Sequence, residues 1–304
     1  MTTVTATPTD LTLGRVGTVE ASGRPRAANV GRNANREPGR RRRWRPARDA
    51  LWSLLDGHVE DGARVAVVGA GNGDDVPLRR LARRAGRVDL IDLDHDALLY
   101  ARRRVRRRRS RVCIHSQDVT GGAADAIIAG ALGETAGPIA PPKTPIGPGA
   151  PYDVVVADLM FTQLLYPALQ DAGLSSAEIE TALRADGQAL ADGVAACLHA
   201  AAPDGVVIYV HDMLGWWPGH PQPFGLDEVL ELAPHHREAA LALAGTGALP
   251  RGCDPRLAAA RANADVIQTD FWAWPFAPDT SYLVCATVAR TSPARSEPTD
   301  GLPR

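Results

Sequence analysis

The sequence predicts an α/β fold: a doubly wound, mostly parallel seven-stranded sheet with helices on both faces and a C-terminal antiparallel hairpin. Strand-like apolar runs alternate with segments of helical length through most of the 304-residue chain, which is the pattern of a parallel sheet. The last two runs are separated by one short turn, as in a hairpin. The first run, VAVV, ends at the turn GAGNG, and ligands bind to parallel sheets at such strand ends.

Local spacing places the individual elements. A helical repeat of apolar residues opens the fold at 44–59. The expected parallel strands are 64–68, 87–93, 111–118, 152–158 and 205–211, and the expected helices are 75–85, 96–109, 122–132, 175–199 and a segment from 227 onward. Ser175 and Glu178 have the spacing of a capping box. The Pro/Gly-rich stretch 137–151 predicts a loop, and strands 266–272 and 281–289 form the expected hairpin.

The two ends of the chain differ from this pattern. Residues 1–43 and 291–304 are rich in small, polar and arginine residues without an apolar repeat, so both are expected to be disordered tails around a single domain, 44–290. No apolar stretch reaches the ~18 residues of a membrane span, and the first residues do not resemble a signal peptide. The expected location is therefore the cytoplasm. The four cysteines form no CxxC pair, and no metal site is expected.

The glycine turn excludes two common ligands. The dinucleotide fingerprint GxGxxG requires a glycine where this chain has Asp74. Asp74 and Asp75 would repel a pyrophosphate, and no Gly-Lys-Ser/Thr follows as in a P-loop. The turn therefore suits a ligand that has no phosphate or that carries positive charge. The simpler interpretation of the two aspartates is that they cap the helix that follows.

The pattern VAVVGAGNG followed by VDLIDLD in the next strand resembles class I S-adenosylmethionine-dependent methyltransferases, over most of residues 44–290. The resemblance implies S-adenosylmethionine as cofactor and in-line methyl transfer to a small-molecule substrate. It implies that Gly69, Gly71 and Gly73 let the backbone approach the methionyl part of the cofactor. Asp92, with Asp94 as the alternative, would then bind the ribose hydroxyls.

Two more positions follow from the same resemblance. Asp118, after the third strand, would hold the adenine amine. Asp158, after the fourth strand, would border both cofactor and substrate. The sequence ADLMFTQLLYP at that point lacks the Asn/Asp-Pro-Pro-aromatic marker of methyltransferases that act on exocyclic base amines and glutamine, and it lacks a nucleophilic cysteine.

The fifth expected strand is followed by HDMLGWWPGHPQPF. His211 lies at the ligand edge and is a candidate general base, because its unperturbed pKa is near neutral. Trp216, Trp217 and His220 are candidate substrate contacts, in a loop that either closes over the substrate or fills a gap between sheet and helix.

Two arginine-rich segments, 40–48 and 102–111, remain unexplained. A polyanion such as nucleic acid is one partner for them, but the net charge of −1 does not favour it. Two functions stay as alternatives to methyl transfer: an aminopropyltransferase-like enzyme on the same fold, and a non-catalytic protein that binds S-adenosylmethionine or RNA.

Overall fold

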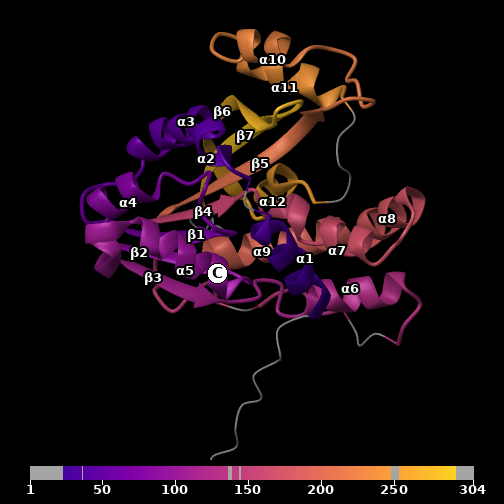
Figure 1. The fold of residues 1–304 in the computed structure, drawn as a ribbon, viewed down its shortest axis with the longest axis horizontal. Helices are drawn as coiled ribbons and strands as arrows, with labels where there is room; N and C mark the ends of the chain where they lie inside the picture. The colour runs from indigo at the N-terminus through magenta and orange to yellow at the C-terminus, as the bar shows by residue number, and fades with distance from the viewer. Residues whose placement is uncertain (1–22, 36, 136–138, 144, 248–252, 292–304) are drawn as a thin grey trace, which may run out of the picture.

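A seven-stranded sheet of order β3-β2-β1-β4-β5-β7-β6 organises the protein. The computed structural model describes residues 23–35, 37–135, 139–143, 145–247 and 253–291 (Figure 1). β1 to β5 pair in parallel, and β7 pairs antiparallel with both β5 and β6. The strands are β1 (Arg64–Val68), β2 (Arg87–Asp92), β3 (Val112–Ser116), β4 (Val154–Asp158), β5 (Val206–Trp216), β6 (Ala264–Ala277) and β7 (Thr280–Thr291). The predicted fold class, with its C-terminal hairpin, is confirmed.

Helices cover both faces of the sheet. One apolar core lies between the sheet and α3 (Arg45–Asp56), α4 (Leu78–Arg84) and α5 (His95–Arg104). The opposite core packs the sheet against α6 (Ala123–Ala131), α7 (Tyr166–Asp171), α8 (Ser176–Ala182), α9 (Gln188–Ala201) and α12 (Pro255–Arg261). The capping box of Ser175 and Glu178 is present at the start of α8. None of the helices in the described ranges is both long and apolar enough to cross a membrane.

A third, smaller core lies beyond the sheet edge. β5 continues to Trp216, five residues past the predicted end, because β7 pairs with it along its whole length. Met213 and Leu214 of this extension, with Leu283 of β7, pack with α10 (Leu226–Leu232) and α11 (Arg237–Gly245). Figure 1 shows these two helices standing apart from the layers over the parallel strands.

The N-terminal segment differs from the expected disordered tail. Residues within it form α1 (Gly23–Ala34) and α2 (Arg40–Arg43). α1 buries Pro25 and Ala28 and forms two ion pairs with distant residues: Arg24 Nη2 lies 2.7 Å from Glu134 Oε1, and Arg32 Nη1 lies 3.0 Å from Asp171 Oδ2. Residues 1–22 and 292–304, the other parts expected as tails, lie outside the described residues.

Arginines from both arginine-rich segments fix the glycine turn. Asp74, only 7% exposed, pairs with Arg40 at 2.7 Å and with Arg104 at 2.5 Å. Arg48 donates to the Asp74 carbonyl oxygen, and Arg104 also donates to the Asn72 carbonyl oxygen. The predicted capping role of Asp74 is therefore wrong: α4 begins only at Leu78, and its N-cap makes no side-chain hydrogen bond.

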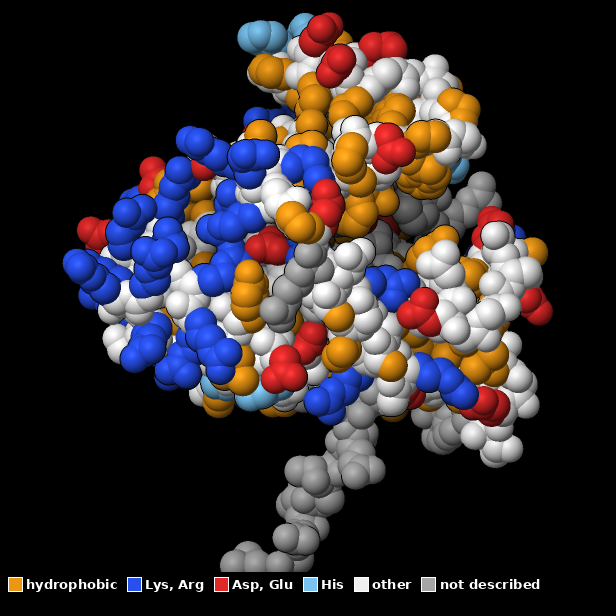
Figure 2. Space-filling view, viewed as in Figure 1, with side chains coloured by type: hydrophobic (Ala, Val, Ile, Leu, Met, Phe, Trp, Pro, Cys, Tyr) orange, Lys and Arg blue, Asp and Glu red, His pale blue; other side chains and the backbone are white. Residues whose placement is uncertain are grey.

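Other arginines cover the outer face of α2 to α5, where Figure 2 shows basic side chains gathered. The helix expected over 96–109 stops at Arg104, because Arg106 has a φ of 60° and the following residues form a short 3-10 turn. Arg107, Arg108 and Arg109 are exposed there.

We expect Asp74→Ala to lower the free energy of unfolding by about 3–5 kcal/mol, because it leaves Arg40 and Arg104 buried without their partner. Urea unfolding followed by circular dichroism measures this loss. The matched control is Asp49→Ala, which removes an exposed carboxylate that pairs with Arg45 and Arg80 and should cost less than about 1 kcal/mol. Equal losses for the two variants would contradict a structural role for the buried pair.

Candidate functional site

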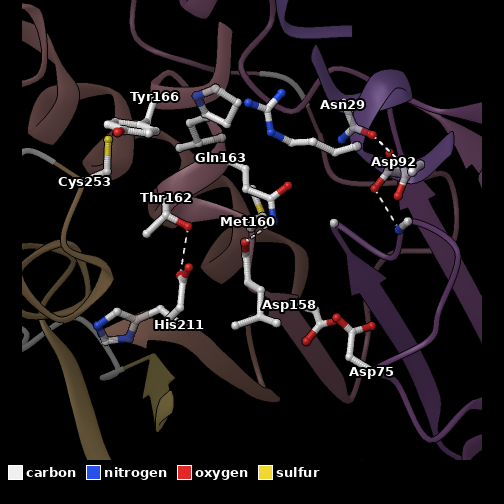
Figure 3. Close-up of a pocket in the computed structure, with 18 of the residues that line it drawn as sticks. Asn29, Asp75, Asp92, Asp158, Met160, Thr162, Gln163, Tyr166, His211 and Cys253 are labelled. Carbon is white, nitrogen blue, oxygen red and sulfur yellow. Dashed lines mark hydrogen bonds between the residues drawn. The ribbon is translucent and has the colours of Figure 1, made fainter. Parts of the chain in front are cut away.

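A cavity of about 890 Å³ opens at the carboxyl ends of β1, β2, β4 and β5. Its volume is at the upper end of the range for small-molecule sites. The strand order reverses between β1 and β4 at this edge, which is where ligands bind in doubly wound sheets. Figure 3 shows side chains from the turn after β1, from β2, and from the segments after β4 and β5 converging on it.

The glycine turn forms one wall of the cavity. Gly69 and Gly71 line it with φ values of 77° and 45°. A Cβ on Gly69 would lie 2.8 Å from both the Asp158 carbonyl oxygen and the Met160 Cβ, so only glycine fits there. Gly73 is not among the lining residues of the cavity; its Cα faces Leu78, whose Cδ1 would lie 2.6 Å from an added Cβ.

Asp92 joins the ends of β1 and β2. Its Oδ2 accepts a hydrogen bond from the Gly71 amide at 2.8 Å, and its Oδ1 accepts one from the Asp94 amide at 2.9 Å. Each oxygen keeps a second lone pair, and the residue lines the cavity. Burial raises the pKa of Asp92 to about 6. Asp94 does not line the cavity and instead caps α5 by accepting from the Ala97 amide.

Asp118 lies at the same edge, after β3, and also lines the cavity. Its carboxylate accepts hydrogen bonds from the Thr120 amide, the Thr120 hydroxyl and the Gly122 amide, which build the turn into α6. The preceding Gln117 is fixed by Pro145 and Gly147. Three of the acceptor positions of Asp118 are thus used by the protein itself.

Two more aspartates face each other at the bottom of the cavity. Figure 3 shows the carboxylates of Asp75 and Asp158 pointing toward one another. Asp158 is 2% exposed, and its Oδ1 has no hydrogen-bond partner. Burial, followed by the charges of Asp75 and Asp92, raises the pKa of Asp158 well above its usual value. Burial likewise raises the pKa of Asp75 to about 6. Asp75 lines the cavity and does not cap α4, so the capping role that the sequence predicted for it is wrong.

His211 and Asp212 follow one another on β5 and lie in different surroundings. Burial lowers the pKa of His211 to about 4, so its imidazole is neutral at pH 7, and its Nδ1 has no partner. Asp212 accepts a hydrogen bond from the Thr162 hydroxyl at 2.8 Å, and burial raises its pKa to about 6. Both residues line the cavity.

The two tryptophans of the fifth-strand segment separate. Trp217 lines the cavity, is 40% exposed and stacks on His220 with ring centroids 4.0 Å apart. Trp216 is not among the lining residues; its Nε1 donates to the Phe224 carbonyl oxygen, and its ring packs edge-on against Phe224 in the third core.

Sequence reasoning missed several lining residues. Asn29, Arg32 and Asn33 come from α1, whose polar sequence gave no helical signal. Tyr282 and Trp274 come from the hairpin, for which the sequence predicted strands but no contact with a ligand. Asp212 was placed at the ligand edge beside His211 by the sequence but was given no role; it lines the cavity.

No protein-family description matches the sequence, and no curated protein matches it. Among solved structures, a SAM-dependent methyltransferase from Aquifex aeolicus is 13% identical with a TM-score of 0.41, and the match covers 88% of this chain and 98% of that one. The N-methyltransferase NodS from Bradyrhizobium japonicum WM9, in complex with S-adenosyl-L-homocysteine, is 12% identical with a TM-score of 0.39, over 89% and 100% of the two chains. Likenesses this weak carry no conclusion about activity.

The order and direction of the strands show the fold class directly. The order β3-β2-β1-β4-β5-β7-β6, with β7 antiparallel to its neighbours, is that of a doubly wound, Rossmann-like sheet with an antiparallel C-terminal hairpin.

We expect Trp216→Ala to lower the free energy of unfolding by about 3 kcal/mol, since it empties part of the third core. Trp217→Ala should cost less than about 1 kcal/mol, because its ring is exposed and packs mainly on His220. Urea unfolding of both variants tests the difference. Equal losses would mean that Trp217 also supports the fold and is not free to serve the cavity.

We expect Asp212→Asn to stabilise the ligand-free protein at pH 7.5 and to have a clearly smaller effect near pH 4.5. A carboxyl whose native pKa lies above its unfolded value of ~3.9 destabilises the native state by an amount that grows as pH rises from the unfolded pKa to the native pKa and is complete above the native pKa. Two pKa units correspond to about 3 kcal/mol, and partial exposure of Asp212 reduces the expected gain to about 1–2 kcal/mol.

Urea unfolding of both proteins at the two pH values gives the result. Taking the difference between variant and parent cancels His199 and His211, whose lowered pKa values act with the opposite sign. A stability difference that does not change with pH would contradict the raised pKa of Asp212.

Proposed function

We propose that the protein binds S-adenosylmethionine and transfers its methyl group to a small-molecule acceptor in the cavity. The main support is the junction between the bare turn and Asp92, where Gly71 and the carboxylate are hydrogen-bonded beside the cavity. This junction offers a close backbone approach and a carboxylate with free lone pairs at one point.

The charges of the cavity suit this cofactor. S-adenosylmethionine carries a sulfonium and an ammonium group and no phosphate. Asp75 and Asp158 lie next to the turn with raised pKa values, and Asp158 Oδ1 lacks a partner, so both acids gain from a cationic ligand. A pyrophosphate in the same place would meet buried negative charge.

Different residues then bind different parts of the cofactor. Asp92 accepts the two ribose hydroxyls, since Asp94 is committed to the cap of α5. Asp118 holds the adenine amine with its remaining acceptor capacity, and the Gly69 and Gly71 backbone contacts the methionyl part. Gly73 keeps a conformational role in the turn, with a φ of 61°.

The contribution of the chain to the reaction is alignment in a closed site. The bound cofactor supplies an electrophilic methyl group on its sulfonium. Leu159 and Met160, 5% and 6% exposed, and the α1 residues on the opposite wall keep water from the donor. Asp158 lies between the cofactor side and the acceptor side. His211 is neutral at pH 7 and is the candidate base, while Trp217 and His220 form the outer wall for the acceptor.

We expect S-adenosylhomocysteine to bind to the purified protein with a heat measurable by calorimetry. Asp92→Ala should weaken this binding by about 1.5–3 kcal/mol, the value of a hydrogen bond to a charged group. The control is Asp94→Ala, which removes a helix cap worth about 1 kcal/mol of stability and should leave affinity nearly unchanged. No heat with folded protein would reject the cofactor, and a larger loss for Asp94→Ala would move the ribose contact to that residue.

A further inference from the structure

The cavity contains more unpaired acid than the proposed cofactor needs, and this inference rests on that proposed function. The three arginines that line it each have a carboxylate partner: Arg32 pairs with Asp171, Arg40 with Asp74, and Arg256 with Asp254 at 3.1 Å. Within the described residues, the cavity offers no unpaired arginine or lysine to an anionic acceptor. An acceptor recognised through a carboxylate or phosphate is therefore disfavoured.

The unpaired acids lie on two sides of the cavity. Asp75 and Asp92 lie at the cofactor side with Asp158, whose buried Oδ1 has no partner. Figure 3 shows Thr162 on the other side, and Thr162 holds the carboxylate of Asp212. The positive charges of the cofactor can be matched by the first group. Asp212 then remains as a partly buried negative charge facing the acceptor space.

Four rings, Trp217, Trp274, Phe276 and Tyr282, form an aromatic wall beside Asp212. Tyr282 is at its centre, with ring centroids 5.7 Å from Trp274, 5.5 Å from Phe276 and 6.2 Å from Trp217. All four line the cavity. Burial raises the pKa of Tyr282, and the charge of Asp212 raises it further, which places that carboxylate near the wall.

We propose that the methyl acceptor is the nitrogen of a compact primary or secondary amine, which enters as an ammonium ion between Asp212 and the aromatic wall. Aromatic faces attract cations through their quadrupole, and a buried carboxylate favours a charged donor over a neutral one. Asp158, with its free oxygen, faces the same space from the cofactor side. Alcohols and acids of the same shape satisfy neither group.

The step balances with the groups present. For an amine acceptor, Asp212 takes the role of base in place of His211: the ammonium gives one proton to the Asp212 carboxylate, which frees the nitrogen lone pair. That pair forms the new N–C bond while the C–S bond of the donor breaks and its electrons stay on sulfur. The products are a neutral thioether and an N-methylated ammonium, and the proton leaves Asp212 for solvent.

The experiment uses full-length protein saturated with S-adenosylhomocysteine and matched probes that differ in one group. Benzylamine, 2-phenylethylamine and tryptamine are compared by calorimetry with 2-phenylethanol and 3-phenylpropionate. At least one amine should bind ten or more times more tightly than the alcohol, and the acid should not bind. Asp212→Asn should reduce this preference to about threefold or less. The control is Asp204→Asn, an exposed aspartate in the turn before β5, which should leave the preference unchanged.

A second measurement uses mass spectrometry to follow methyl transfer from S-adenosylmethionine to the amine that binds most tightly. The mass of that amine is expected to increase by one methyl group. If S-adenosylhomocysteine itself does not bind, the proposed function fails. If it binds but no amine binds at millimolar concentration, or the alcohol or acid binds as well as the amines, the amine inference alone is overturned. A preference that survives Asp212→Asn also overturns the assignment of that residue.

Discussion

The burial of aspartates at one sheet edge, without enough cations to pair them, is the constraint on which the site depends. The parallel strands β1, β2, β4 and β5 run to this edge: Asp92 and Asp158 are the last residues of β2 and β4, and Asp212 lies within β5. Charge buried without a cationic partner is costly, and this cost is the reason why burial raises the pKa values of these acids. A ligand with positive charge would lower that cost.

Asp74, in contrast to the aspartates of the cavity, has a structural role. It is one residue from Asp75, yet Arg40 and Arg104 neutralise it and fix the turn. The sequence alone left a polyanion as one possible partner of the two arginine-rich segments. In the structure their inward-facing arginines bind the glycine turn, and their outward-facing arginines are exposed to solvent. This division explains why two adjacent aspartates have different roles, and why α1 and α2 must be part of the folded unit.

The strength of each sequence signal explains what could be predicted. β1 was predicted with its observed bounds because an unbroken apolar run ends at glycines. The edge residues Asp92, Asp118 and Asp158 were expected from the resemblance to class I methyltransferases, and all three line the cavity. α1 could not be predicted, since distant ion pairs such as Arg24–Glu134 hold it. The extension of β5 was also missed, because its pairing partner β7 lies about seventy residues later and no local pattern encodes that contact.

The extension of β5, which the sequence did not predict, positions the residues that we propose contact the methyl acceptor. By running to Trp216, β5 places Asp212 inside the paired region, opposite Val284 of β7. The same pairing sets Tyr282 and Trp274 on adjacent strands, so one antiparallel hairpin supplies most of the aromatic wall. Trp216 is then needed by the third core, which supports the extension, and Trp217 faces the cavity. Successive residues of an extended chain point to opposite sides, so Trp216, the last residue of β5, packs against the third core while Trp217 lines the cavity.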